Sequence, residues 1–307
     1  MATLTSAPTS EATSTVATGP TTSTPSATPP GSATTTSTAD PGAPVLLAAG
    51  DIASCSSADD EATAALLAAR PVAVVATLGD NVYEQGSPDE FTRCYQPSWG
   101  ASAPRTKPSA GNHDYATAGA AGYFGYFGPA AGNPARGYYS YDLGAWHVVA
   151  LNSNCSIVSC STGSAQERWL RDDLAAHPDG CTLAYWHHPR FSSGTTHGSS
   201  SAVSPLWQAL YAGHADLVLQ GHEHNYERFA PLDPSGRSDP ERGLRSFVVG
   251  TGGRSHYPLG PPLPGSEARN GDTYGVMQLT LRPSGVDWQF LAVAGGRFGD
   301  TGSADCR

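Results

Sequence analysis

The chain has 307 residues, a formal net charge of −10 and six cysteines. This acidic balance argues against a general nucleic-acid-binding role, because such proteins carry basic surfaces. The sequence contains no apolar run long enough to span a membrane as a helix. The charge remains compatible with a small phosphorylated substrate that is held by metal ions.

Residues 1–43 differ in composition from the rest of the chain. They are mainly Ser, Thr, Pro and Ala, with almost no large apolar side chain. Such a segment cannot bury enough surface to offset the entropy lost on ordering, so we expect a disordered linker or stalk. Residues 44–307 are long enough for one large domain with its own core.

The start of the chain lacks the basic and apolar regions of a signal peptide. A Ser/Thr/Pro stalk and six cysteines nevertheless favour an extracellular or cell-surface protein, with the stalk as its tether.

No C-x-x-C pair occurs among the six cysteines, so disulfides are a better interpretation than a zinc ribbon. We expect the pairs Cys155–Cys160, Cys55–Cys94 and Cys181–Cys306; six buried free thiols are the alternative.

Apolar runs alternate with helical patterns after residue 44. The expected elements, in chain order, are a strand at 44–51, a helix at 58–69, a strand at 72–80, a polar cluster at 107–114, hairpin strands at 137–143 and 146–153, a helix at 165–177, a strand at 181–189, a helix at 204–213, a strand at 215–224 and antiparallel strands within 245–253 and 273–293. Ser164 and Glu167 form a capping-box pattern at the start of the helix 165–177.

This order, a βαβ series followed by antiparallel strands, predicts an α/β fold. Polar residues occur at or just after the C-terminal ends of its strands. They are Asp51, Asp80, Asn112, His187 and His222, with His224 close behind. Ligands of open α/β sheets bind at that edge, so we expect these side chains to converge on one crevice.

Each of these positions has an ordinary explanation when taken alone. Asp51 could be a helix N-cap, and the pair Gly79-Asp80 could be a turn. Together, however, they supply carboxylate, amide and imidazole groups, which suit hard or borderline divalent and trivalent cations. Six such groups exceed the needs of one ion that must also bind water or substrate. The pattern therefore predicts a two-metal site with one bridging carboxylate.

The motifs D-x-A, GD-x-x-Y, GNHD, H-x-P and GH-x-H follow one another from Asp51 to His224. This order resembles the calcineurin-like metallophosphoesterases. Ala53 stands where many members have a histidine ligand, and Tyr83 and the segment "GHEHNYER" resemble the purple acid phosphatase branch, in which a tyrosinate replaces that histidine. The resemblance implies a four-layer αββα sandwich of two mixed β-sheets flanked by helices. Residues 44–307 would be a compact catalytic domain of this family.

The resemblance also implies a ligand set at the C-terminal edge of the strands. The first metal would be bound by Asp51, Tyr83 and His224, the second by Asn112, His187 and His222, and Asp80 would bridge them. Because a phenolate is a hard anionic ligand, we expect Fe(III) at the first position, with Zn(II), Fe(II) or Mn(II) at the second.

Two histidines are candidate catalytic residues. His113 follows the expected ligand Asn112, and His197 resembles the substrate-binding histidine that the family carries after H-x-P. We expect Asn112, His113 and His197 to contact the substrate, with the histidines assisting departure of the leaving group. His188 and His256 are interpreted as structural, whereas Asp114 either orients His113 or caps a turn.

The favoured function is hydrolysis of phosphoric esters, chiefly as an acid phosphomonoesterase in which a metal-bound hydroxide attacks phosphorus in line. A phosphodiesterase or nucleotide hydrolase on the same metal core is the alternative. A non-catalytic exported surface protein is a less favoured interpretation. The expected partner is a small phosphorylated substrate, with no nucleic acid as a specific partner.

Overall fold

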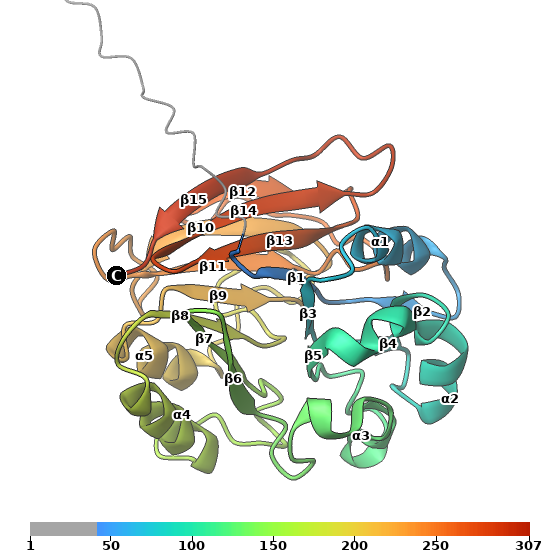
Figure 1. The fold of residues 1–307 in the computed structure, drawn as a ribbon, viewed down its shortest axis with the longest axis horizontal. Helices are drawn as coiled ribbons and strands as arrows, with labels where there is room; N and C mark the ends of the chain where they lie inside the picture. Colours follow the sequence, from blue (N-terminus) through green and yellow to red (C-terminus); the bar gives the residue numbers. More distant parts are fainter. Residues whose placement is uncertain (1–41) are drawn as a thin grey trace, which may run out of the picture. The chain divides into compact units, whose positions relative to one another are not determined.

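Two large β-sheets face each other in the computed structural model, which describes residues 42–307 (Figure 1). The predicted linker at 1–43 lies outside the described residues, apart from its last two positions. Within 42–307, no helix combines the length and the apolarity that crossing a bilayer requires.

The first sheet has six strands, in the order β15-β14-β13-β1-β3-β5. Its strands are β1 (Val45–Ala49), β3 (Val74–Leu78), β5 (Thr106–Ser109), β13 (Gly275–Arg282), β14 (Gly285–Ala292) and β15 (Thr301–Asp305). β1, β3 and β5 run parallel, whereas the other three strands pair antiparallel. β1 and β3 are largely buried apolar runs, as is typical of strands covered on both faces.

The second sheet has seven strands, in the order β12-β10-β11-β9-β8-β7-β6. Its strands are β6 (Tyr139–Leu143), β7 (Trp146–Ala150), β8 (Cys181–Tyr185), β9 (Leu217–Gln220), β10 (Tyr226–Leu232), β11 (Leu244–Val249) and β12 (Ser266–Asn270). The central four, β7, β8, β9 and β11, are parallel, and the remaining strands are antiparallel to their neighbours. A separate two-stranded sheet pairs β2 (Ala53–Ser54) with β4 (Val82–Tyr83).

Strand alternation divides the core into two clusters. Val148 and Ala150 of β7 belong to the cluster that also contains the residues of β1 and β3, so they pack between the sheets. Val149 of the same strand packs outwards with Leu170 and Leu206. The outer face is thus covered by α4 (Ala165–Ala176) and α5 (Ser204–Ala212).

The other helices lie on the opposite side of the molecule in Figure 1. They are α1 (Asp59–Ala68), α2 (Pro88–Glu90) and α3 (Ala121–Phe127), with the short helices η1 (Phe91–Tyr95), η2 (Trp99–Arg105), η3 (Ala118–Ala120) and η4 (Gly128–Ala131). Helices on both sides of two mixed sheets confirm the predicted four-layer α/β sandwich.

The predicted capping box at α4 is only half formed. The Ser164 hydroxyl accepts a hydrogen bond from the Glu167 backbone N–H at 3.2 Å. The Glu167 carboxylate, however, accepts from the Gly163 N–H at 2.9 Å rather than from Ser164. A complete box occurs at α2, between Ser87 and Glu90.

All three predicted disulfides are confirmed, and the described residues contain no free cysteine. Cys155–Cys160 closes a local loop, whereas Cys181–Cys306 joins β8 to the end of the chain across 125 residues. These cross-links reduce the entropy of the unfolded chain and are typical of proteins in oxidising compartments.

Candidate metal centre

The predicted ligands converge at the C-terminal edge of the parallel strands. Asp51 follows β1, Asp80 follows β3, His187 follows β8, and both His222 and His224 lie between β9 and β10. Asn112 follows β5, and Tyr83 comes from the short strand β4. The six side chains that the edge-of-sheet argument named therefore lie close together, and Tyr83, which only the family resemblance indicated, lies among them.

The first group of atoms surrounds the Tyr83 hydroxyl oxygen. It lies 2.8 Å from Asp51 Oδ1, 3.0 Å from Asp80 Oδ2 and 3.2 Å from His224 Nε2. His224 Nε2 is also 3.3 Å from Asp51 Oδ1. These four side chains are almost entirely buried.

The second group surrounds His187 Nε2. This atom lies 3.1 Å from Asn112 Oδ1, 3.1 Å from His222 Nδ1 and 3.2 Å from Asp80 Oδ2. Asp80 Oδ2 thus belongs to both groups. His187 is fully buried, but Asn112 is exposed and His222 is half-buried, so the second group is the one that solvent reaches.

The proton count of both groups favours cations. The Tyr83 hydroxyl has one proton but faces three acceptor atoms. His187 Nε2 can carry at most one proton, yet it too faces three potential acceptors. Clustered acceptors that outnumber the protons available to them are destabilising unless positive charge lies among them. The residues present therefore fit two cations, one in each group.

Three of these residues have strained backbones. Asp51, Asp80 and His222 have φ values of 60°, 49° and 71°, in the left-handed region that non-glycine residues rarely adopt. The structure describes only two other non-glycine residues with positive φ. Such strain concentrates at functional sites, where the surrounding fold maintains it.

Gly79 allows one of the close approaches in the site. It has a φ of +83°, and a Cβ atom there would lie 2.6 Å from His187 Nδ1. A side chain at this position would displace the imidazole ring. The glycine of the GD pair is therefore needed both for the turn and for the space beside His187.

Residues outside the candidate ligand set orient two of the imidazoles. His187 Nδ1 lies 2.8 Å from the Leu78 carbonyl, and His224 Nδ1 lies 2.7 Å from the Ser255 hydroxyl. Each contact occupies one ring nitrogen and leaves Nε2 for the site, as in metal-binding histidines generally. The Tyr257 ring also stacks on His224, with centroids 3.8 Å apart.

Sequence reasoning missed Ser255 and Tyr257. Both lie in the loop after β11, which ends at the same edge of the sheet as β8 and β9. Their position at that edge was the available signal, whereas only His256, which lies between them, was considered from the sequence. His256 instead stacks on Tyr274, with centroids 3.9 Å apart, which agrees with the structural interpretation.

Burial and neighbouring charges shift the pKa values of the groups in the site. Burial raises the pKa of Tyr83 well above 10, and Asp51 and Asp80 raise it further. Burial opposes ionisation of Asp80, but His187 outweighs this effect and lowers the pKa of the carboxyl. Burial, and then the charge of His187, lowers the pKa of His222. A cation among these groups would favour the phenolate and the neutral imidazoles. It would therefore lower the pKa of Tyr83, which burial and the carboxylates raise.

His113 lies beside the first group. Its backbone N–H donates to Asp80 Oδ1 at 2.8 Å, and its ring packs on Tyr83 with centroids 4.3 Å apart. His113 Nδ1 lies 2.7 Å from the Glu84 carbonyl, which leaves the other ring nitrogen free of described partners. The described hydrogen bonds of the Asp114 carboxylate come from Asn81 and from the Gly111 N–H rather than from the His113 ring, so Asp114 caps the turn.

His197 lies on the opposite side, beside the second group. Its exposed ring stacks on His222, with centroids 4.1 Å apart. A cavity of about 480 Å³ lies here, lined by His188, His197, His222 and residues 196–202. His188 lies behind His222, and its Nδ1 is 2.8 Å from the Ser153 hydroxyl. Burial lowers the pKa of His188 to about 3, so this ring is neutral.

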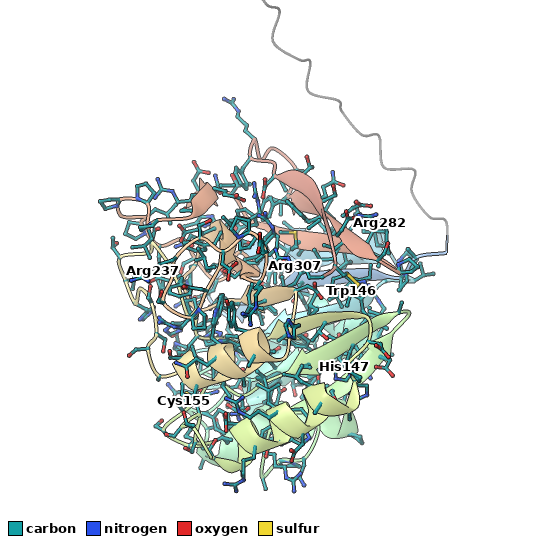
Figure 2. All side chains as sticks on the ribbon, turned by 90° about the vertical axis from the view of Figure 1, so that its left-hand side faces the viewer. Trp146, His147, Cys155, Arg237, Arg282 and Arg307 are labelled. Carbon is teal, nitrogen blue, oxygen red and sulfur yellow. A yellow bond between two sulfur atoms is a disulfide. The ribbon has the colours of Figure 1, made fainter. Side chains whose placement is uncertain are left out.

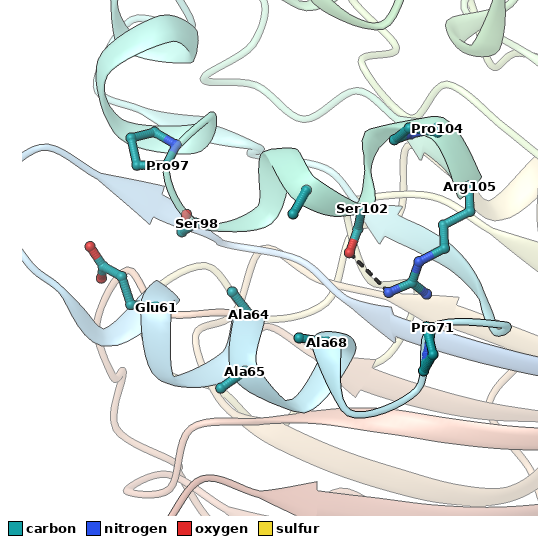
Figure 3. Close-up of a pocket in the computed structure, with 11 residues that line it drawn as sticks. Glu61, Ala64, Ala65, Ala68, Pro71, Pro97, Ser98, Ser102, Pro104 and Arg105 are labelled. Carbon is teal, nitrogen blue, oxygen red and sulfur yellow. Dashed lines mark hydrogen bonds between the residues drawn. The ribbon is translucent and has the colours of Figure 1, made fainter.

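A second large cavity has a different character. It measures about 440 Å³ and lies between α1 and η2, where Ala64, Ala65, Pro97 and Pro104 line it (Figure 3). None of the candidate ligands reaches it. Its polar groups include Arg105, whose guanidinium donates to the Ser102 hydroxyl at 3.0 Å. This cavity lacks the acceptor cluster that distinguishes the metal centre.

Comparisons with known proteins agree with this geometry. The family model for calcineurin-like phosphoesterases matches residues 44–226, which is more than half of the chain. Purple acid phosphatase 15 of Arabidopsis thaliana is 32% identical over 116 residues, which cover 34% of this chain and 21% of the relative. An uncharacterized protein of Mycobacterium tuberculosis is 30% identical over 185 residues, or 48% of this chain and 35% of that one. The chain spans about a third or less of the length of these relatives.

Solved structures show the same fold at low sequence identity. The purple acid phosphatase PPD1 from yellow lupin seeds superposes with a TM-score of 0.65 and 18% identity, covering 85% of this chain and 53% of that one. GAP50, an anchor in the inner membrane complex of Plasmodium, gives 0.64 and 14% identity, covering 86% and 89%. Because an anchor shares the fold, the fold alone does not carry an activity.

Proposed function

The chain belongs to the calcineurin-like phosphoesterase family, and on that premise we propose that it is a dinuclear-metal phosphoric ester hydrolase, acting chiefly as an acid phosphomonoesterase. The observation that carries the proposal is the position of Asp80 Oδ2. It lies 3.0 Å from the Tyr83 oxygen and 3.2 Å from His187 Nε2, so one carboxylate oxygen is shared by both acceptor groups. A shared carboxylate is how two-metal sites hold their ions close together.

The proposed ligand set follows the two groups. Asp51, Tyr83 and His224 would hold one ion, with Asn112, His187 and His222 at the other and Asp80 shared. Fe(III) suits the phenolate of Tyr83, whereas Zn(II), Fe(II) or Mn(II) suits the second position. When bound, the ions supply charge neutralisation for the phosphoryl oxygens and a lower pKa for water at the site.

The remaining steps fall to the chain's own residues. Exposed Asn112 and half-buried His222 mark the side where the substrate enters. His113 and His197 flank that opening, one beside Tyr83 and the other on His222. We assign them to hold the phosphate and to assist departure of the leaving alkoxide, which needs a proton or a positive partner.

The substrate is proposed to be a small phosphorylated molecule, with hydrolysis outside the cytoplasm. The three disulfides support an oxidising compartment. A phosphodiesterase or nucleotide hydrolase on the same ions remains the second candidate, because loops rather than the metal core decide between these substrates.

Two measurements test the proposal. Purified protein should be coloured by a tyrosinate–Fe(III) charge-transfer band and should contain iron by elemental analysis. A colourless protein with zinc at both positions would contradict the Tyr83–Fe(III) assignment and leave the esterase proposal intact.

The second measurement compares two substrates. We expect p-nitrophenyl phosphate to be hydrolysed much faster than bis-p-nitrophenyl phosphate, with activity below neutral pH. The reverse preference, or activity only above about pH 9, would reject the acid monoesterase.

A further inference from the structure

The residue between the two candidate histidine ligands points away from the metal centre. Glu223 is fully buried, and its Oε1 accepts a hydrogen bond from the His197 backbone N–H at 2.5 Å and another from the Gly198 N–H. Its carboxylate therefore holds the loop that carries His197. The segment "HEH" thus supplies two side chains to the metal centre and one to a neighbouring loop.

We call residues 192–202 the serine-rich loop. A second buried carboxylate holds its beginning, because Glu227 accepts hydrogen bonds from the Ser193 N–H and the Ser193 hydroxyl, both at 2.6 Å. Backbone hydrogen bonds join Thr195 to Pro258 at 3.1 Å and Ser200 to Pro189 at 2.7 Å. The loop is thus fastened at several points, and within residues 42–307 only Glu223 holds the backbone N–H of His197 itself.

Gly194 shows how closely the carboxylate approaches the loop. A Cβ atom at this position would lie 2.2 Å from Glu223 Cδ. Any side chain at residue 194 would therefore displace the carboxylate, the loop or both. The glycine makes room for the contact between Glu223 and the N–H groups that follow.

The position of the loop decides where the His197 ring stands. The ring stacks on His222 and borders the cavity that opens beside the second acceptor group. His197 itself is exposed, so side-chain packing alone does not fix it. Fixing its backbone reduces the conformations that the ring must lose when it meets a leaving group.

We propose that Glu223 is a positioning residue that acts through His197: it fixes the loop so that the imidazole meets the departing oxygen of a bound phosphoric ester. This inference rests on the proposed esterase function. It predicts that Glu223 matters most for esters whose leaving group needs a proton. An alkyl phosphate such as glycerol phosphate has such a leaving group, whereas p-nitrophenolate departs readily without help.

The test compares Glu223→Val with wild type on both esters. We expect kcat for glycerol phosphate to fall by about 100-fold, and kcat for p-nitrophenyl phosphate to fall by less than about 3-fold, with the metal content unchanged. Glu223→Gln keeps an acceptor oxygen and should restore most of the lost rate. Combining Glu223→Val with His197→Ala should cost no more than the larger single change, because the two act as a unit. Equal losses on both esters, or additive effects, would overturn the proposal.

A measurement without substrate separates this inference from the proposed function. Hydrogen exchange at the His197 and Gly198 amides should speed up in Glu223→Val and in Gly194→Ala, whereas the Ser193 amide, held by Glu227, should keep its protection. Unchanged protection at His197 and Gly198 would refute the positioning role. If the wild-type protein hydrolyses neither ester, the proposed function fails, and the exchange rates still decide whether Glu223 holds the loop.

Discussion

Among residues 42–307, two clusters of histidine and carboxylate use the same residue types in opposite ways. One is the metal centre. The other, which we call the His147 clamp, contains His147 on β7, which Figure 2 labels. Its other members are Asp142 on β6, and Asp173 and His177 at α4. His147 Nδ1 lies 3.0 Å from Asp142 Oδ1, and its Nε2 lies 2.8 Å from Asp173 Oδ2.

The difference lies in the second ring nitrogen. In the His147 clamp both ring nitrogens face carboxylates, an arrangement that favours the doubly protonated ring, which has no lone pair for a metal. Burial opposes this charge, but the hydrogen bonds that the ring donates to Asp173 and Asp142 prevail and raise the pKa of His147. In the metal centre, by contrast, Nδ1 of His187 and Nδ1 of His224 each contact an uncharged protein oxygen. The Nε2 atom of each ring faces further acceptors. Proximity of histidine and carboxylate is therefore not enough to identify a metal site.

The largest expected effect comes from the carboxylate that both acceptor groups share. Asp80→Ala should lower kcat/KM by more than about 100-fold, which exceeds the loss usual for residues that only orient a ligand. Bound metal should be lost at both positions. Elemental analysis and steady-state kinetics measure this outcome. Asp173→Ala removes a carboxylate from the His147 clamp and should leave the metal content at the wild-type value. A variant Asp80→Ala with full metal content would contradict the shared position.

The next effect separates catalysis from metal binding. His113→Ala should lower kcat by about 10²–10⁴-fold, because its ring lies beside Tyr83 and has a nitrogen free for the substrate. Both ions should remain bound, since none of the contacts between acceptor atoms involves the His113 ring. Metal loss in step with the loss of rate would show that His113 instead supports the centre itself.

A smaller effect is expected from the hydroxyl that orients His224. Ser255→Ala removes the 2.7 Å contact to Nδ1 and should weaken binding of the first metal by about 10–100-fold. Competition with a chelator measures this change, and Ser255→Thr is the matched control that retains a hydroxyl. Unchanged affinity would mean that Tyr257, stacked on the same ring, is sufficient to orient it.

The smallest effect concerns stability and tests the His147 clamp. Because the folded-state pKa of His147 is raised above 6.5, its contribution is fully present below that pH and is lost as the pH rises through the folded pKa. The pKa of Asp173 is lowered, mainly by the hydrogen bond from His147 acting against burial, so its contribution is lost on acidification below about pH 4.

Denaturant unfolding at several pH values measures this contribution. Relative to His147→Asn, the wild-type protein should be more stable by about 1–2 kcal/mol near pH 5–6, after allowance for the exposure of Asp142. This advantage should shrink towards pH 9. An advantage that does not change with pH would mean that His147 is held as a neutral ring.

Much of the metal centre was predictable because of where strands end. Asp51, Asp80, His187 and His222 each follow a strand, and parallel strands bring their C-terminal ends to one edge whatever the loops do. Ser255 was not predicted because a serine in a Gly-rich loop forms no distinctive motif; its place after β11 was the one signal, and its distance from His224 shows what it contacts. β12 and β15 escaped because partly exposed edge strands such as "SEARN" and "TGSAD" lack the apolar alternation of a half-buried strand.

The sequence by itself determined the α/β order, the candidate ligands and the family resemblance, because these depend on residue type and on position along the chain; the disulfide pairing was expected from it, but the structure decided it. Only the tertiary structure decided what each polar side chain faces. It turned Glu223 away from the histidines on either side of it and towards the His197 loop, and it gave His147 two carboxylates in place of a cation. The direction of a side chain and its neighbours depend on packing between segments far apart in sequence, which no local pattern specifies.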